Sequence, residues 1–157
     1  MQDFVHLHVH TQYSLLDGQA SVSRLVDKAM KDGMKGIAVT DHGNMFGIKE
    51  FTNYVNKKNS GPKGEIKDLK KRIAGIESGE IECEDKEAEI ADCRAKMAEA
   101  ESKLFKPIVG CEMYVARRTM DKKEGKPDQS GYHLIVLAKN EKGYHNLIKL
   151  VSHAWTR

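Results

Sequence analysis

Apolar and polar residues alternate at the beginning of the chain. The apolar residues Val5, Leu7 and Val9 alternate with the histidines His6, His8 and His10. Because successive side chains of a strand point to opposite faces, the alternation predicts a strand over residues 4–11 with a row of imidazoles on one face. Imidazole nitrogens are good ligands for divalent metals, so such a row favours metal binding. A chance cluster of partly solvated histidines is the alternative.

The following segments have the pattern of a β-α-β unit. After a polar loop, apolar residues follow helical spacing over 22–30, and Gly33 ends the pattern. Residues 36–40 form a continuous apolar run, which is typical of a strand buried on both faces of a parallel sheet. A second helix is predicted over 48–55. The chain is therefore expected to open as strand, helix, strand, helix.

Residues 60–105 differ in composition from the rest of the chain. This stretch begins with the breakers Gly61 and Pro62 and is then rich in Glu, Lys, Asp and Ala. Two narrow apolar stripes predict two antiparallel helices: Ile66, Leu69, Ile73 and Ile76, then Ile90, Cys93, Met97 and Leu104. We expect a charged helical hairpin inserted into one domain that spans 1–157. Its charges are usually those of a solvated face, and a specific binding role is the alternative.

Strand-like runs return after the hairpin. Residues 106–116 and 132–138 are both predicted to be strands, and residues 141–157 are predicted to form a last helix. Strands that alternate with helices indicate the α/β fold class with a parallel sheet. Such sheets bind their ligands at the C-terminal ends of the strands, so functional side chains are expected there.

Composition excludes several classes of protein. The chain has 157 residues, enough for one domain with a core. Its 26 basic and 23 acidic residues nearly balance, so the net charge of +3 is too small to argue for nucleic-acid binding by itself. The chain contains neither a long apolar run nor a basic start, which predicts a cytoplasmic protein without a membrane span or signal peptide. The three cysteines lack paired spacing and are expected to be reduced packing residues.

Residues with metal-binding side chains lie near the expected strand ends. They are histidines, an aspartate and a glutamate that lie far apart in the sequence: His8, His10, Asp17, His42, Glu112 and His133. Six such ligands are too many for one tetrahedral ion and suit two or more clustered metals. Clustered metals activate water and clamp phosphate oxygens during phosphoester cleavage. Redox chemistry at a non-haem iron is the competing use of these ligand types.

The same residues lie in motifs that resemble those of a known family. The polymerase and histidinol phosphatase (PHP) family has motifs similar, in the same order, to these segments: His8-Val9-His10-Thr11, Asp17-Gly18, Thr40-Asp41-His42-Gly43, Gly110-Cys111-Glu112 and His133-Leu134-Ile135-Val136-Leu137-Ala138. The resemblance covers the chain outside the hairpin. It is closest to the branch of the family found at the amino terminus of bacterial replicative DNA polymerases.

The resemblance implies the first half of a distorted seven-stranded (β/α) barrel with a metal cluster at its C-terminal rim. The six residues named above would be the ligands, for zinc or manganese in the first place. His6 falls outside the family's histidine pair and would be structural, which differs from the strand-face interpretation. Asp41 would orient the loop or a ligand. Family members that are active phosphatases or nucleases have further ligands, expected beyond Arg157, so this amino-terminal piece is expected to be at most weakly active, and no catalytic residue is assigned.

Three functions follow from this resemblance. The favoured one is a module of a DNA-directed DNA polymerase, a nucleotidyltransferase of DNA replication, with metal-dependent phosphoesterase or 3′–5′ exonuclease proofreading potential; the polymerase active site would lie elsewhere. The others are a stand-alone phosphatase of a small phosphoester and a non-catalytic scaffold that docks a proofreading exonuclease. The implied partners are the rest of the polymerase chain, DNA, an exonuclease subunit and a sliding clamp, with no membrane. An unpaired strand edge further predicts self-association.

Overall fold

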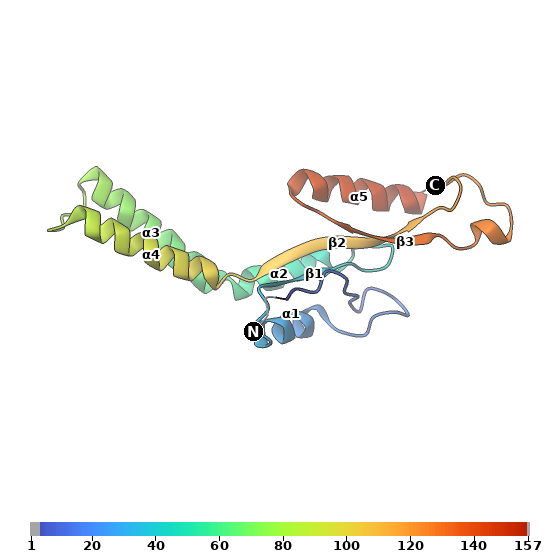
Figure 1. The fold of residues 1–157 in the computed structure, drawn as a ribbon, viewed down its shortest axis with the longest axis horizontal. Helices are drawn as coiled ribbons and strands as arrows, with labels where there is room; N and C mark the ends of the chain where they lie inside the picture. The colour runs from blue at the N-terminus through green and yellow to red at the C-terminus, as the bar shows by residue number, and fades with distance from the viewer. Residues whose placement is uncertain (1–3, 157) are drawn as a thin grey trace. The chain divides into compact units, whose positions relative to one another are not determined.

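The computed structural model describes residues 4–156, which form a mixed α/β structure (Figure 1). Its elements follow in the order α1 (Val22–Lys31), β1 (Gly36–Val39), α2 (Ile48–Lys58), α3 (Ser60–Ser78), α4 (Lys86–Ser102), β2 (Lys106–Val115), the short 3-10 helix η1 (Lys126–Asp128), β3 (Tyr132–Leu137) and α5 (Glu141–Thr156). They form two compact units, one of which is Val55–Phe105. Among the described residues, no helix is long and apolar enough to cross a bilayer. The predicted α/β class is confirmed.

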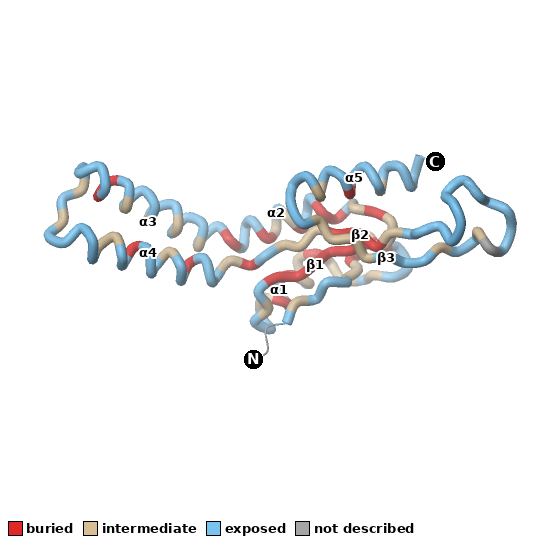
Figure 2. Tube along the Cα trace, turned by 45° about the horizontal axis from the view of Figure 1, so that its top comes forward, coloured by how far each residue is buried: buried red, intermediate tan, exposed pale blue. Residues whose placement is uncertain are grey.

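A three-stranded sheet in the order β1-β2-β3 organises the first unit. β1 runs parallel to β2, with Val39 opposite Val109. β3 runs antiparallel to the second half of β2, with His133 opposite Tyr114. Helix α1 packs on β1 and α5 packs on β2, and these helices lie on opposite sides of β2 in Figures 1 and 2. The parallel pairing of β1 agrees with the prediction made from its apolar run.

The core of this unit lies around β1, all four residues of which are buried (Figure 2). Helix α1 buries Val22, Val26 and Ala29, which share one face because they are spaced by one or two helical turns. In β2, a side chain at Gly110 would come within 2.7 Å of the Val136 carbonyl oxygen, so only glycine fits this close approach. The predicted helix after residue 21 and strand after residue 35 are therefore present.

The strand predicted over 132–138 is present as β3, but its first half is exposed. Tyr132 and Leu134 are 61% and 53% exposed, because β3 pairs only with β2 among the described residues and forms an edge of the sheet. Its antiparallel direction also differs from the expected parallel sheet. The last helix predicted over 141–157 is present as α5, in which only Leu147 is buried and Trp155 is 69% exposed.

No regular strand forms over residues 4–11. The segment lies along β1, and the backbone carbonyl oxygens of His6 and Val9 each accept a hydrogen bond of 2.9 Å from that strand or the residue after it. The chain bends at Leu7 and His8, which interrupts the ladder. The alternating pattern therefore predicted a strand where the structure has an irregular segment beside β1.

In the second unit, α3 and α4 pack against each other. Ile76 of α3 and Cys93 of α4 are buried. Helix α3 ends at Gly79, whose φ of 82° is the left-handed conformation typical of a helix C-terminus. Asp85 begins α4, since its carboxylate accepts a hydrogen bond of 3.0 Å from the Ala88 N–H. These local signals explain where the two helices stop and start.

We predict that the hairpin can be removed without loss of the first unit. The Asn59 side chain joins the two ends of the hairpin, donating to the Phe105 carbonyl (2.8 Å) and accepting from the Phe105 N–H (2.9 Å). Replacing residues 61–103 by a short Gly-Ser linker keeps the two hydrogen bonds between Asn59 and Phe105. The free energy of unfolding is expected to change by less than about 1 kcal/mol, which is the scale of loop-closure entropy. Urea unfolding followed by circular dichroism measures it. A variant that fails to fold while the parent folds would make the hairpin part of the core.

Candidate metal centre

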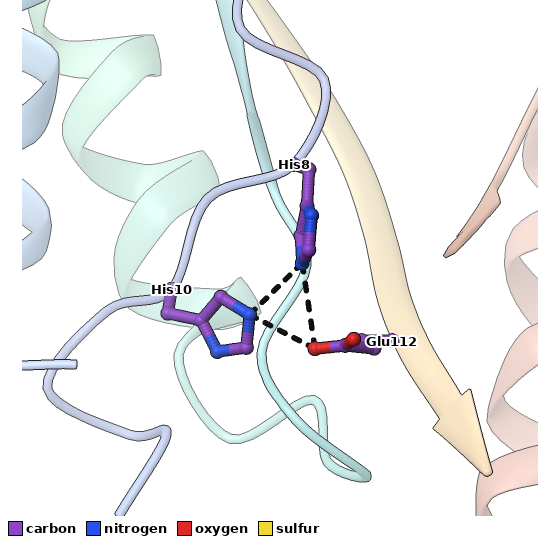
Figure 3. Close-up of side chains that lie close together, drawn as sticks. All are labelled: His8, His10 and Glu112. Atoms are coloured by element: carbon purple, nitrogen blue, oxygen red, sulfur yellow. Dashed lines mark hydrogen bonds and ion pairs between the residues drawn. The ribbon is translucent and has the colours of Figure 1, made fainter. Parts of the chain in front are cut away.

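Three potential metal-ligand atoms come together at His8, His10 and Glu112 (Figure 3). The Nε2 atoms of the two imidazoles are 3.0 Å apart. Oε2 of Glu112 lies 2.9 Å from Nε2 of His10 and 3.4 Å from Nε2 of His8. The Glu112 side chain is only 6% exposed, whereas that of His8 is 51% exposed. The cluster is therefore anchored in the protein at the carboxylate and open to solvent at His8.

The other carboxylate oxygen of Glu112 faces a second group of ligands. Its Oε1 lies 2.9 Å from Nδ1 of His133. Close by, Oδ2 of Asp17 lies 2.8 Å from Nδ1 of His42. Potential ligand atoms within 4.8 Å of one another form three overlapping groups: His8, His10 and Glu112; His10, Asp17 and His42; His42, Glu112 and His133. The fold thus gathers all six residues singled out in the sequence, and His6 belongs to none of these groups.

The sheet explains this convergence. His42 follows the C-terminal end of β1 and forms a parallel bridge with Glu112, which lies on β2. His133 is at the start of β3, and because β3 is antiparallel to β2, that start lies beside the end of β2. The segment that contains His8 and His10 follows β1 to the same edge. Four chain segments therefore meet at one place.

The donor set has the character of a cation site. Imidazole nitrogens without a proton and carboxylate oxygens all carry lone pairs, so their approach to within 2.9–3.4 Å requires a shared proton or a cation between them. Nε2 of His42 is buried and, within residues 4–156, has no hydrogen-bond partner. Since buried polar atoms are nearly always paired, this nitrogen indicates a missing partner such as a metal ion.

Two carboxylates of the cluster have lowered pKa values. At Glu112, burial raises the pKa, but the hydrogen bond from His8 and the charges of His42, His8 and His10 together lower it below its usual value. The hydrogen bond from His42 lowers the pKa of Asp17. Because each folded-state pKa lies below the unfolded one, both groups stabilise the fold above the unfolded pKa of about 4. That contribution is lost as the pH falls through the folded pKa.

Asp41 lies outside the three groups and holds the loop that follows the histidines. It is 1% exposed, and its carboxylate accepts hydrogen bonds from the Thr11 N–H (2.6 Å), the Thr11 hydroxyl (2.9 Å) and the Ser14 hydroxyl (3.2 Å). In the same loop, a side chain at Gly18 would meet the Thr11 carbonyl oxygen at 2.1 Å. The loop therefore depends on a buried carboxylate and on a residue without a side chain.

Sequence reasoning missed Ser14. Its hydroxyl oxygen lies 2.8 Å from Nδ1 of His10 and accepts a hydrogen bond of 2.8 Å from the His42 N–H. When the hydroxyl donates to Asp41, Nδ1–H of His10 donates to Ser14, which leaves the Nε2 lone pair directed at Glu112. Nothing in a serine within a polar loop distinguishes this role from that of a turn residue.

Tyr114 was also missed. Its ring stacks on His42, with centroids 4.5 Å apart, and meets His133 edge-on at 5.1 Å. The strand period of two carries a signal, because Tyr114 and Glu112 are two positions apart on β2 and so share a face. A hollow of about 630 Å³ beside these rings is lined partly by Arg117 and Lys122.

Cys111 is not a candidate ligand, although it lies next to Glu112. The residue is fully buried, and its thiol donates to the backbone carbonyl of Asp41 at 3.3 Å. Burial raises the pKa of this thiol to about 11, so it stays protonated at neutral pH. All three cysteines are free, as their spacing predicts.

Comparisons with known proteins give the family. The model of the PHP domain matches residues 6–157. DNA polymerase III subunit alpha of Borreliella burgdorferi is 39% identical over 150 residues, which cover 95% of this chain and 9% of the relative. The same subunit of Treponema pallidum is 39% identical over 97% of this chain, and that of Aquifex aeolicus is 32% identical over 98%. This chain spans about a tenth of the length of these relatives. The resemblance seen in the motifs is confirmed, and the chain belongs to the PHP domain family.

Proposed function

We propose that this chain is the metal-binding PHP module of a replicative DNA polymerase alpha subunit. The support is twofold: relatives named DNA polymerase III subunit alpha align along almost the whole chain, and the sheet brings together six residues whose side chains could bind a metal. The polymerase activity named in those relatives belongs to much longer proteins. We assign no part of nucleotide transfer to the residues described here.

The observation that carries the proposal is the convergence of these ligands around a buried, unpartnered nitrogen. His8, His10, Asp17, His42, Glu112 and His133 are proposed to hold divalent metals. Imidazole and carboxylate donors suit zinc or manganese. When bound, such metals activate water and stabilise the oxygens that enter and leave in phosphoester cleavage.

The residues of the cluster would bind the metals and also orient one another. Glu112 presents Oε2 to His8 and His10 and Oε1 to His133, so its carboxylate can serve two neighbouring ligand groups at once. Asp17 accepts the Nδ1 proton of His42, which leaves the buried Nε2 of His42 as a lone-pair donor. The Asp41 carboxylate orients the loop through Thr11 and Ser14, and the Asp41 backbone carbonyl accepts a hydrogen bond of 3.1 Å from the Glu112 N–H.

The hollow beside the cluster is the proposed path for substrate. Arg117 and Lys122 line it, together with the rings of Tyr114 and His133. Cationic side chains favour an anionic phosphoester, and aromatic rings offer a surface on which a base or sugar can pack. Phosphoesterase or 3′–5′ exonuclease chemistry is the proposed use of this path.

The sheet is proposed to be the first part of a distorted (β/α) barrel. In support, β1 and β2 are parallel, helices cover both sides, and the ligands gather at the C-terminal ends of these two strands. The free edge of β3 would pair with further strands or with a second copy of the chain.

A non-catalytic scaffold is the second candidate. Glu112 with His133 and Asp17 with His42 already form hydrogen-bonded pairs without an ion, so the cluster can also stabilise the fold by itself. Such a module would dock an exonuclease subunit or act beside a sliding clamp. A small-phosphoester phosphatase is disfavoured because the relatives named above are polymerase subunits.

Hydrolysis of a nitrophenyl phosphodiester with added manganese or zinc tests the catalytic reading. We expect bound metal but little or no turnover, because the family's further ligands are not among the six residues. The matched variants are His10→Ala, within the cluster, and His6→Ala, outside it. Robust turnover that His10→Ala abolishes and His6→Ala preserves would show that the six residues suffice for catalysis. Absence of metal from the parent protein would favour the scaffold.

We predict that Ser14→Ala lowers metal affinity by about 10- to 100-fold, the usual effect of losing a partner that orients a metal ligand. The change removes the group that fixes the His10 ring, whose Nδ1 lies 2.8 Å away, but none of the six ligands. Competition with a chromogenic chelator measures the affinity. Ser23→Ala, in α1, is the control. Equal affinities in Ser14→Ala and the parent would exclude this role for Ser14.

A further inference from the structure

Four lysines lie along one face of α3. Lys63, Lys67, Lys70 and Lys71 are all exposed and, with Ile66 and Ala74, line a shallow groove on the helix. Their spacing of three, four and eight residues places them on one face. The four span about 12 Å along the helix axis at 1.5 Å per residue. We call these four residues the lysine ridge.

Two acidic residues of α3, Glu65 and Asp68, do not line the lysine groove, although they line a neighbouring groove together with Lys71. In the described residues, none of the ridge ammonium groups forms an ion pair, and the Lys63 ammonium donates to the Asn56 side-chain oxygen at 2.8 Å.

Of the five remaining cations of residues 60–105, three form ion pairs, whereas Lys86 and Arg94 form none among the described residues. Arg72 pairs with Glu89, and on the second helix Lys96 pairs with Asp92 at 2.6 Å. Just after that helix, Lys103 pairs with Glu99 at 2.7 Å. Four of the six cations of residues 60–105 without an ion pair in the described structure therefore lie on the ridge.

We propose that the lysine ridge binds the sugar-phosphate backbone of double-stranded DNA without sequence specificity. Lysine binds phosphate as a flexible point charge, and a row of lysines releases counterions from a duplex. The groove contains no arginine, asparagine or glutamine, the side chains that most often read base edges. Affinity is therefore expected to depend on salt and not on sequence.

The composition of the hairpin disfavours other anionic partners. Neither α3 nor α4 contains an aromatic residue, whereas single-stranded nucleic acids are usually held by aromatic stacking and membrane-surface helices insert large apolar side chains. Carboxylates of a protein partner are matched best by the planar fork of arginine, and every cation of the ridge is lysine. Duplex phosphate is the chemistry that remains.

This inference does not involve the metal centre, which belongs to the other compact unit. The choice of DNA over another duplex rests on the proposed function. Binding is therefore measured in EDTA, which removes divalent metal, so that failure of the ridge and failure of the metal centre are separate results.

The experiment is fluorescence anisotropy with a labelled 30-base-pair duplex and the whole chain, at several salt concentrations. The variant Lys67→Gln/Lys70→Gln/Lys71→Gln is compared with Arg94→Gln/Lys96→Gln/Lys103→Gln, which has the same change in net charge. We expect the ridge variant to bind at least about tenfold more weakly at 50 mM salt. The plot of log K against log salt is expected to become less steep by about 2.7, because each of the three lost phosphate contacts contributes about 0.9 to its slope. The control variant is expected to keep the parent slope.

Any of three results would overturn the proposal. The first is a parent chain that shows no salt-dependent binding to the duplex. The second is an equal loss of affinity in the two triple variants, which would reduce the effect to net charge. The third is tighter binding of the parent to a single strand or to vesicles of anionic phospholipid than to the duplex. Circular dichroism checks that both variants remain helical, as expected because Gln and Lys have similar helix propensities.

Discussion

Glu112→Gln is expected to lower the affinity for divalent metal by about 100-fold or more, beyond the loss typical of a residue that merely orients a ligand. The change preserves size but removes the charge, and one carboxylate oxygen becomes an amide nitrogen that cannot bind a metal. Because Oε2 faces His10 at 2.9 Å and Oε1 faces His133 at 2.9 Å, one substitution damages two ligand groups. Isothermal titration calorimetry with zinc or manganese measures the loss.

The matched control is Glu82→Gln, which removes an exposed carboxylate between the two hairpin helices. The control is expected to bind metal as the parent does. The prediction for Glu112 fails if its glutamine variant keeps the parent affinity while remaining folded, because then the carboxylate would be a structural partner of the histidines and not a ligand.

Asp41→Ala is expected to destabilise the protein by about 3–5 kcal/mol, as the loss of a buried hydrogen-bonded charge does. The carboxylate accepts three hydrogen bonds from Thr11 and Ser14, and both of these residues are buried. Without it, an N–H and two hydroxyls lose their partner in the interior. Urea unfolding without metal measures the change.

Two comparisons sharpen this second prediction. Asp41→Asn keeps one acceptor oxygen and is expected to cost less than the alanine change. Asp121→Ala, in an exposed loop, is expected to cost less than about 0.5 kcal/mol. A small effect of Asp41→Ala, similar to that of Asp121→Ala, would mean that the loop around Thr11 is held by other contacts.

The six candidate ligands could be found from the sequence because each lies in a short motif at an expected strand end. Strands that are neighbours in one sheet then bring such ends together, whatever the exact bounds of each strand. The pattern also predicted α1 and β1, where a helical stripe and a continuous apolar run leave little choice.

The direction of β3 could not be found in this way. A run such as residues 132–137 records burial and strand propensity but not the direction of the neighbouring strand. The antiparallel pairing nevertheless brings His133 to the cluster, because the start of β3 lies beside the end of β2. The wrong direction of β3 therefore affected the prediction of the fold but not the expectation that His133 lies near the other candidate ligands.

The first segment shows a second limit. Alternation at His6, His8 and His10 predicted one row of imidazoles, but the bend at Leu7 and His8 breaks the strand and leaves His6 outside the cluster. Ser14 could not be recognised either, because its role depends on contacts with Asp41 and His42, which are more than 25 residues away.

The metal content of the purified chain tests the central claim most directly. After dialysis against zinc or manganese at neutral pH, mass spectrometry is predicted to find at least one ion per parent chain and per His6→Ala chain, and less in His8→Ala and His10→Ala. The bound metal is also predicted to fall on acidification, because protons compete with the metal for the same nitrogens. Parent protein without metal, or equal metal in all four proteins, would contradict a metal centre at this edge of the sheet.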